Sequence, residues 1–276
     1  MFESVGRSWE LMKKSFGVLK KDKELIIFPI ISTIATLILM VLFFVPLFTV
    51  DMFKSEALFY AWIFLAYVVL YFVTIFFNAA LIGAANIRLN GGDPKLSDGI
   101  EAAKKNLSNI FAWAIIAATV GLILNIIRDK LKDNNWIGKI VIGFIGAAWN
   151  IATYFVVPVL VMEGVGPFQA IKKSLDVVKN RFGETAIGGF GIGILGMVLW
   201  LIVVGIGILV GIVGGFIAGI ATVVILGILV FSFTQALEGI YIAALYNYAK
   251  SGEDKSELGL NNLIILNKEK QESLGM

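Results

Sequence analysis

The chain has 276 residues, of which 58% are hydrophobic and 16% are charged, and its formal net charge is +3. A soluble domain carries about 25% charged residues, so this composition excludes an ordinary soluble protein, and the small net charge argues against nucleic acid as a partner. The sequence contains no Cys and no His, which excludes thiol catalysis, disulfides, imidazole proton transfer and most zinc or haem sites. We therefore expect no cofactor and no metal.

Six apolar segments follow one another along the chain, and each is long enough to cross a bilayer. They cover approximately residues 26–49, 58–83, 107–127, 137–160, 186–210 and 216–245. The first is too long to be the hydrophobic region of a cleavable signal, so we expect a retained span. The pattern predicts an all-α, polytopic transmembrane helix bundle, with a single transmembrane domain over residues 1–249 and a polar cytoplasmic tail over 250–276.

Glycines mark the boundary between the last two segments. Gly214-Gly215 predicts a turn, because paired glycines interrupt helices. Glycines also recur every four residues at positions 207, 211, 215 and 219, which would suit one continuous helix with a smooth packing face. The G-x-G-x-x-G run within residues 189–196 has no strand before it and no acidic residue about 20 positions later, so it indicates helix packing and not nucleotide binding.

Basic residues are distributed unevenly between the two ends of these segments. Most of the 23 lysines and arginines lie at the N-terminus, after the second and fourth segments, and in the C-terminal tail. The other connections hold only Lys54, Arg128, Lys130, Lys132 and Lys139. By the positive-inside rule, this asymmetry predicts a cell-membrane protein with both termini in the cytoplasm, and an even number of spans agrees with that orientation.

A segment with helical periodicity precedes each odd-numbered span. Apolar residues are spaced by three or four within residues 5–19, 100–110 and 168–182, which is typical of one face of an α-helix. The opposite faces carry Lys13, Lys14, Lys104, Lys105, Lys172 and Lys173. Basic amphipathic helices are suited to the headgroup layer, so these lysines are candidate contacts for membrane lipids, anionic ones above all.

We interpret the chain as three parallel repeats, each an interfacial helix followed by a two-span hairpin, at about residues 1–92, 93–164 and 165–249. The stretches IGAANIRLNGGD (82–93) and YIAALYNYAKSGED (241–254) also resemble each other. Any series of hairpins with basic inner connections would show part of this pattern, but the same spacing in three places favours a repeat.

Two stretches, SWELMKKSFGVLKKDKELIIFPIIS (8–32) and PVLVMEGVGPFQAIKKSLDVVKNRF (158–182), resemble an uncharacterised family of six-span integral membrane proteins of bacteria and archaea. The resemblance covers most of the chain and rests on a Pro, a Glu and a Lys-Lys-Ser helix. It implies no assigned activity and no catalytic residues. A weaker likeness is to sulfate permeases of the sulfate-assimilation pathway, which also place an amphipathic stretch before a Pro-containing first span.

Glu238 is the first charged residue after the uncharged run that begins at Thr185. It lies at the inner interface or about 10 Å deeper, depending on where the sixth span begins. Gln235 shares its helical face and is within hydrogen-bonding reach. With Asn78 and Asn150, these residues are candidates for a polar pathway, because ionisable residues in spans usually face the bundle interior. The alternative is a purely structural role, in which such groups tie helices together.

Pro158 and Glu163 lie at a predicted turn on the inner surface. Pro158 is expected to kink the end of the fourth span, and the glycines and proline within residues 164–167 then end the helix. Glu163 is expected either to pair with Lys172 or Lys173, or to lie near a helix N-terminus, where negative charge is favoured.

Two function classes remain open, and we favour the first. It is a transport-class protein, a small channel or permease of unknown substrate, and the second is a non-catalytic membrane-organising or lipid-binding protein. Either one is compatible with a homo-oligomer. An enzyme is not expected, because the sequence offers no metal cluster, no intramembrane carboxylate pair and no Ser-Lys pair at a suitable depth.

Overall fold

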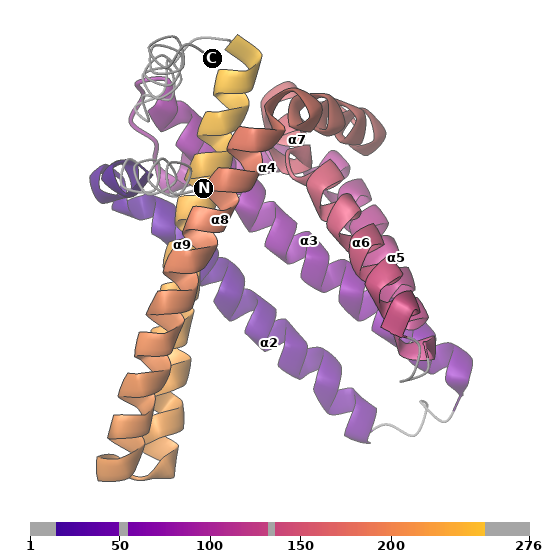
Figure 1. Ribbon diagram of the computed structural model, residues 1–276, viewed down its shortest axis with the longest axis vertical. Coiled ribbons are helices and arrows are strands. Elements are labelled where there is room, and N and C mark those ends of the chain that lie inside the picture. Colours follow the sequence, from indigo (N-terminus) through magenta and orange to yellow (C-terminus); the bar gives the residue numbers. More distant parts are fainter. Residues whose placement is uncertain (1–14, 50–54, 132–135, 252–276) are drawn as a thin grey trace. The chain divides into compact units, whose positions relative to one another are not determined.

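The computed structural model describes residues 15–49, 55–131 and 136–251, and in these ranges the chain is helical and contains no strand. A helical segment at residues 15–21 comes first. The elements after it are η1 (Lys23–Ile26), α2 (Ile27–Thr49), α3 (Glu56–Leu89), α4 (Leu96–Lys105), α5 (Leu107–Lys130), α6 (Trp136–Thr153), α7 (Val156–Glu163), α8 (Pro167–Gly214) and α9 (Phe216–Ser251) (Figure 1). The predicted all-α class is confirmed for the described residues.

Six stretches of these helices are long and apolar enough to cross a membrane. They are Lys23–Phe48, Glu56–Leu89, Leu107–Lys130, Trp136–Glu163, Gly191–Gly214 and Phe216–Asn247. Each overlaps one of the six segments predicted from hydropathy, and their ends differ by a few residues. This pattern indicates a multi-pass membrane protein.

The fourth span is interrupted close to its second end. Helix α6 ends at Thr153 and α7 begins at Val156. Pro158 lies in the first turn of α7, where its missing N–H is tolerated, whereas in a continuous helix its ring would clash with the carbonyl of Tyr154, four residues earlier. The kink expected at Pro158 is therefore a break that precedes it.

Two connections are made by glycines in the left-handed conformation. Gly164 follows α7 with φ +65°, and its N–H donates to the carbonyl of Leu160 at 3.1 Å. Gly215 separates α8 from α9 with φ +91°. Residues with a Cβ rarely adopt this backbone conformation, so glycine suits both positions. The turn predicted at Gly214-Gly215 is confirmed.

Helix α8 differs from the expected arrangement. The sequence suggested an interfacial segment at 168–182 and a separate span from about residue 186, but one helix runs from Pro167 to Gly214. No proline occurs within that helix after its first residue. Gly183 alone disfavours a helix by only about 1 kcal/mol relative to Ala, which is too little to end it.

The chain divides into two compact units, which are described separately. Unit 1 comprises Met1–Ile30, Leu81–Gly99 and Asn180–Met276, and unit 2 comprises Ile31–Ala80 and Ile100–Lys179. The boundaries fall inside α2, α3 and α8.

The core of unit 1 forms around the C-terminal half of α9. From Ala236 to Tyr246, every residue of α9 except Glu238 is buried. The run Leu81–Ala85 of α3 is buried in the same unit, and η1 packs against α9. Small residues in both helices allow this close approach. Phe16 also contacts Phe233 of α9, with ring centroids 5.9 Å apart.

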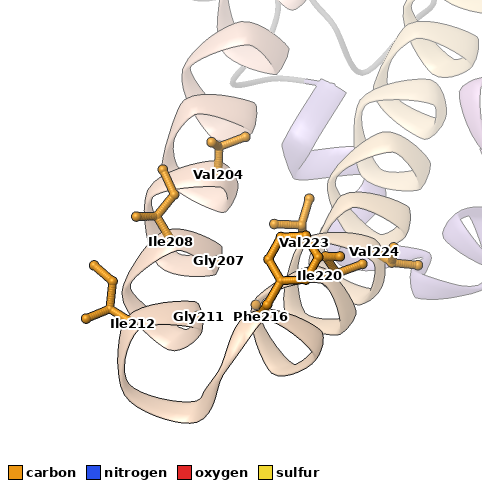
Figure 2. A pocket seen from close by; sticks show the side chains of 10 residues that line it. Val204, Gly207, Ile208, Gly211, Ile212, Phe216, Ile220, Val223 and Val224 are labelled. Atoms are coloured by element: carbon orange, nitrogen blue, oxygen red, sulfur yellow. The ribbon is translucent and has the colours of Figure 1, made fainter.

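The N-terminal half of α9 packs against α8 through glycines. A Cβ atom on Gly219 would lie 2.8 Å from the carbonyl oxygen of Gly207 and 2.9 Å from the Cα of Gly211. The predicted glycine face is thus used inside the hairpin. Beside it lies an apolar groove of about 470 Å³, whose lining includes Ile208 and Phe216 (Figure 2).

In unit 2, aromatic side chains connect successive helices. Trp62 Nε1 in α3 donates to the carbonyl of Phe43 in α2 at 3.0 Å. Trp113 of α5 stacks on Trp149 of α6, with ring centroids 5.9 Å apart. Contacts of this kind fix neighbouring helices laterally where lipid provides no hydrophobic driving force.

The face that the first turns of α8 turn toward unit 2 also differs from the expectation. Phe168 was placed on the packed face with Val178, but its side chain is 78% exposed. The buried positions are Ala170, Ser174 and Val178, spaced by four. In a membrane protein large apolar residues are at no disadvantage beside lipid, and small residues favour helix–helix contact, which accounts for the rotation.

Candidate functional site

Glu238 is the exception in the most buried part of α9. All its neighbours from Ala236 to Tyr246 are buried, whereas Glu238 is partly exposed. Among the described residues, its carboxylate has no ion-pair or hydrogen-bond partner. The candidate span continues to Asn247, about 14 Å further along the helix axis. A carboxylate without a counter-charge within a span is a functional-site candidate.

Two other polar side chains precede Glu238 on α9 at intervals of three. Gln235 is half-buried, and in the described part of the chain it forms no hydrogen bond with Glu238. Ser232 is fully buried, and its hydroxyl has no partner among the described residues. Residues at this spacing lie close together on one side of a helix, so Ser232, Gln235 and Glu238 form a narrow polar strip, here called the α9 strip.

A second polar group of unit 1 joins the N-terminal segment to the end of α3. Arg88 donates from Nε and a terminal nitrogen to both oxygens of Asp22. The same guanidinium donates to Asp93 at 2.6 Å. The side chain of Asp22 is 6% exposed and that of Arg88 17%, whereas that of Asp93 is 90% exposed. The charge of the buried carboxylate is therefore compensated by a two-point ion pair.

Asparagines continue this group toward α9. Asn247 Nδ2 donates to Asn86 Oδ1 at 2.7 Å, and Asn90 Nδ2 donates to the same oxygen at 3.1 Å. The two stretches that resemble each other in sequence, 82–93 and 241–254, are therefore in direct contact. The backbone N–H of Leu96, the first residue of α4, donates to Glu24 Oε2 at 2.9 Å, which places a negative charge at that helix N-terminus.

Sequence reasoning missed most of these residues. Arg88 was counted only as a basic residue near a span end, and Asp22 stands within the charged run at residues 20–24, which is typical of a solvated surface. The signal available was one acidic residue at the start of the first span and one arginine at the end of the second.

In unit 2, Glu163 forms an ion pair with Lys173, one of the two partners expected for it. Asn106 Nδ2 donates to the carbonyl of Val161 at 3.4 Å, and Asn109 Nδ2 donates to that of Gly164 at 3.3 Å. Both bonds satisfy carbonyls at the end of α7, where a helix leaves its last groups unpaired.

The predicted polar pathway is only partly brought together. Asn78 is half-buried on α3 and Asn150 is exposed on α6, and both belong to unit 2. Gln235 and Glu238 belong to unit 1. Convergence of all four residues on one path remains a prediction.

The candidate lipid-contact lysines fall into two kinds. Lys105 pairs with Glu101 at 2.8 Å, and the hydrogen bond from this pair, helped by Coulomb attraction, raises the pKa of Lys105. Lys173 is likewise engaged by Glu163. Lys104 and Lys172 are exposed and have no ion pair within the described part of the chain. Lys13 and Lys14 lie outside the described residues.

The described residues contain no group of three or more acidic side chains able to hold a metal ion. Six apolar helices and a polar site inside one of them define the chain as a multi-pass membrane protein. A family model matches residues 57–256, and the chain belongs to this family of unknown function, DUF6159. The comparison with curated proteins gave no match.

Proposed function

We propose that the protein is a transport-class membrane protein, a small channel or permease, and not an enzyme. One observation carries this proposal: the one partly exposed residue between Ala236 and Tyr246 is the carboxylate Glu238. A helix buried on all sides has no structural use for an unpaired carboxylate, and removing such a group from water is costly unless a partner or solvent reaches it. Access for water or solute to Glu238 explains why the side chain is tolerated.

Labelling of a single cysteine tests this proposal directly, because the chain has no Cys of its own. Glu238→Cys in sealed vesicles is treated with a membrane-impermeant thiol reagent from each side separately. Labelling from both sides, or from the side further from the termini, supports a path through the bundle. If neither side gives labelling while Cys at exposed Lys95 reacts, Glu238 is packed among helices and the transport proposal fails.

The proposal includes a cell-membrane location with both termini in the cytoplasm and three repeated units. Support for the repeat comes from burial. The residue after each Lys-Lys pair is buried in all three segments, and so is the residue four positions later: Ser15 and Leu19, Asn106 and Ile110, Ser174 and Val178. Agreement at two positions in three segments exceeds what basic inner connections alone would produce. Single cysteines at Lys20, Lys95 and Lys172 should all be labelled from the cytoplasmic side.

A second function, binding of anionic membrane lipids, is favoured by the exposed lysines Lys104 and Lys172. An ammonium group without an internal partner at the end of a span can engage a lipid phosphate. Native mass spectrometry with an anionic phospholipid should show weaker binding for Lys172→Gln. The matched variant Lys173→Gln removes an internal ion pair and should leave lipid binding nearly unchanged. Equal lipid binding by the wild type and Lys172→Gln would count against this function. The same measurement in mild detergent reports any homo-oligomer.

A further inference from the structure

We propose that the α9 strip is a cation site: the species bound at Glu238 is a proton or an alkali-metal ion. This inference rests on the proposed transport function and names its substrate class. The two sources of positive charge share one chemistry, neutralisation of a carboxylate by a cation held among oxygen atoms, and the experiment separates them.

The first step is the charge inventory of the α8–α9 hairpin. Between Thr185 and Ala249, Glu238 is the one charged residue in the sequence. No lysine or arginine in that stretch can serve as its counter-ion or attract an anion. A lone negative charge in a pathway selects cations, as rings of acidic residues do in cation channels.

The second step concerns the other charges of unit 1. The guanidinium of Arg88 is already shared by Asp22 and Asp93. Of the lysines in the described part of unit 1, Lys20 and Lys23 are exposed, and none forms an ion pair with Glu238. The missing counter-charge must therefore come from outside the described protein. Buried charges are paired, bound to metal ions or neutralised by a proton, and each of these outcomes requires a cation.

The third step is the chemistry of the strip. The hydroxyl of Ser232 is fully buried with no hydrogen-bond partner among the described residues, and the amide oxygen of Gln235 lies between it and Glu238 along α9. Buried polar groups in proteins are nearly always hydrogen-bonded, so an orphaned hydroxyl calls for an unseen partner. Hydroxyl, amide and carboxylate oxygens suit hard cations and water.

Anions fit the same site poorly. A second negative charge about 4 Å from the carboxylate, at an effective dielectric constant near 20, is disfavoured roughly a thousandfold. The weak likeness of the N-terminal stretch to sulfate permeases would imply an anionic substrate, and the charge inventory points to the opposite sign.

The test uses the full-length protein in proteoliposomes. Proton entry is followed with an internal pH-sensitive dye, alkali-metal entry with radiolabelled rubidium and sodium, and anion entry with radiolabelled sulfate. We expect cation flux from the wild type, at least a tenfold loss with Glu238→Gln and partial recovery with Glu238→Asp. Asp176→Asn, an exposed change in unit 2, serves as the control. Sulfate flux without cation flux, or cation flux unaffected by Glu238→Gln, would overturn the proposal.

A binding measurement separates this inference from the transport function. Purified protein in detergent is treated with a hydrophobic carbodiimide, which modifies protonated carboxyl groups, and modification of Glu238 is quantified by mass spectrometry. Protection by sodium or potassium identifies a metal-ion site, and modification that responds to acidity alone identifies a proton site. Either result without flux would retain the cation site and reject transport. Absence of modification, or modification insensitive to metal ions and acidity, would reject the site itself.

Discussion

The hydroxyl of Ser174 in α8 accepts a hydrogen bond from the backbone N–H of Phe155 at 3.0 Å, at the point where the fourth span is interrupted. Both residues are fully buried. The break that Pro158 imposes releases a backbone donor inside the protein, and a side chain from the next helix satisfies it. The interruption is thus supported from outside the span.

Ser174→Ala should destabilise the protein by about 1–3 kcal/mol, because it leaves the buried N–H of Phe155 without an acceptor. The thermal unfolding of detergent-purified protein, followed by size-exclusion recovery after heating, measures the effect. Gln169→Ala, an exposed change on the same helix, is the control. Equal melting of the two variants would show that another group takes over as the acceptor.

Arg88→Gln should destabilise the protein by about 3 kcal/mol or more, because it leaves the buried carboxylate of Asp22 without its counter-charge. Asp93→Asn removes the exposed partner of the same guanidinium and should cost less than about 1 kcal/mol. The double variant Asp22→Asn/Arg88→Gln should be more stable than Arg88→Gln alone. A double variant at least as unstable as the single one would mean that Arg88 acts through other contacts.

Gly219→Ala should weaken the α8–α9 hairpin by about 1–3 kcal/mol, because the new methyl group would meet the backbone of Gly207 and Gly211. Gly205→Ala is the matched control, since a Cβ at that position meets no atom within 4 Å. Alanine is the better helix former, so the control should be neutral or slightly stabilising. Proteolytic resistance of the purified protein during heating distinguishes the two variants.

Glu101→Gln should speed the reaction of Lys105 with an amine-acylating reagent at mildly alkaline pH. The bond to Glu101 raises the pKa of Lys105, so at a given pH less of it is the reactive free amine. Removing the bond lowers this pKa and increases the reactive fraction. Peptide mass spectrometry gives the rate, with Lys104 in the same peptide as an internal reference. An unchanged ratio of the two rates would show that the pair does not persist in solution.

The membrane class and the six spans could be predicted from the sequence, because length and apolarity are local properties. The turn at Gly215 was predictable for the same reason. The pairs that build the polar site were not. Asp22 and Arg88 are 66 residues apart, and Asn86 and Asn247 are 161 apart. No periodicity within one helix identifies which charged residue of another helix it will meet.

The direction of the amphipathic faces was also beyond the sequence pattern. Periodicity placed Phe168 among residues that pack on protein, although it is exposed. In water an apolar face must be covered by protein, but beside lipid that requirement disappears, and small residues such as Ala170 take the contact. Hydrophobic periodicity therefore locates a membrane helix better than it orients one.

The tip of the α8–α9 hairpin has a consequence for how the protein is made and detected. Val213 and Ile217, on either side of Gly215, are 90% and 83% exposed, and no charged residue lies between Thr185 and Leu237. A connection this short and apolar offers nothing for an antibody or a protease to grasp on that side of the membrane. It also gives the insertion machinery no polar segment to export between the two helices, so they would enter the bilayer together as one preformed pair.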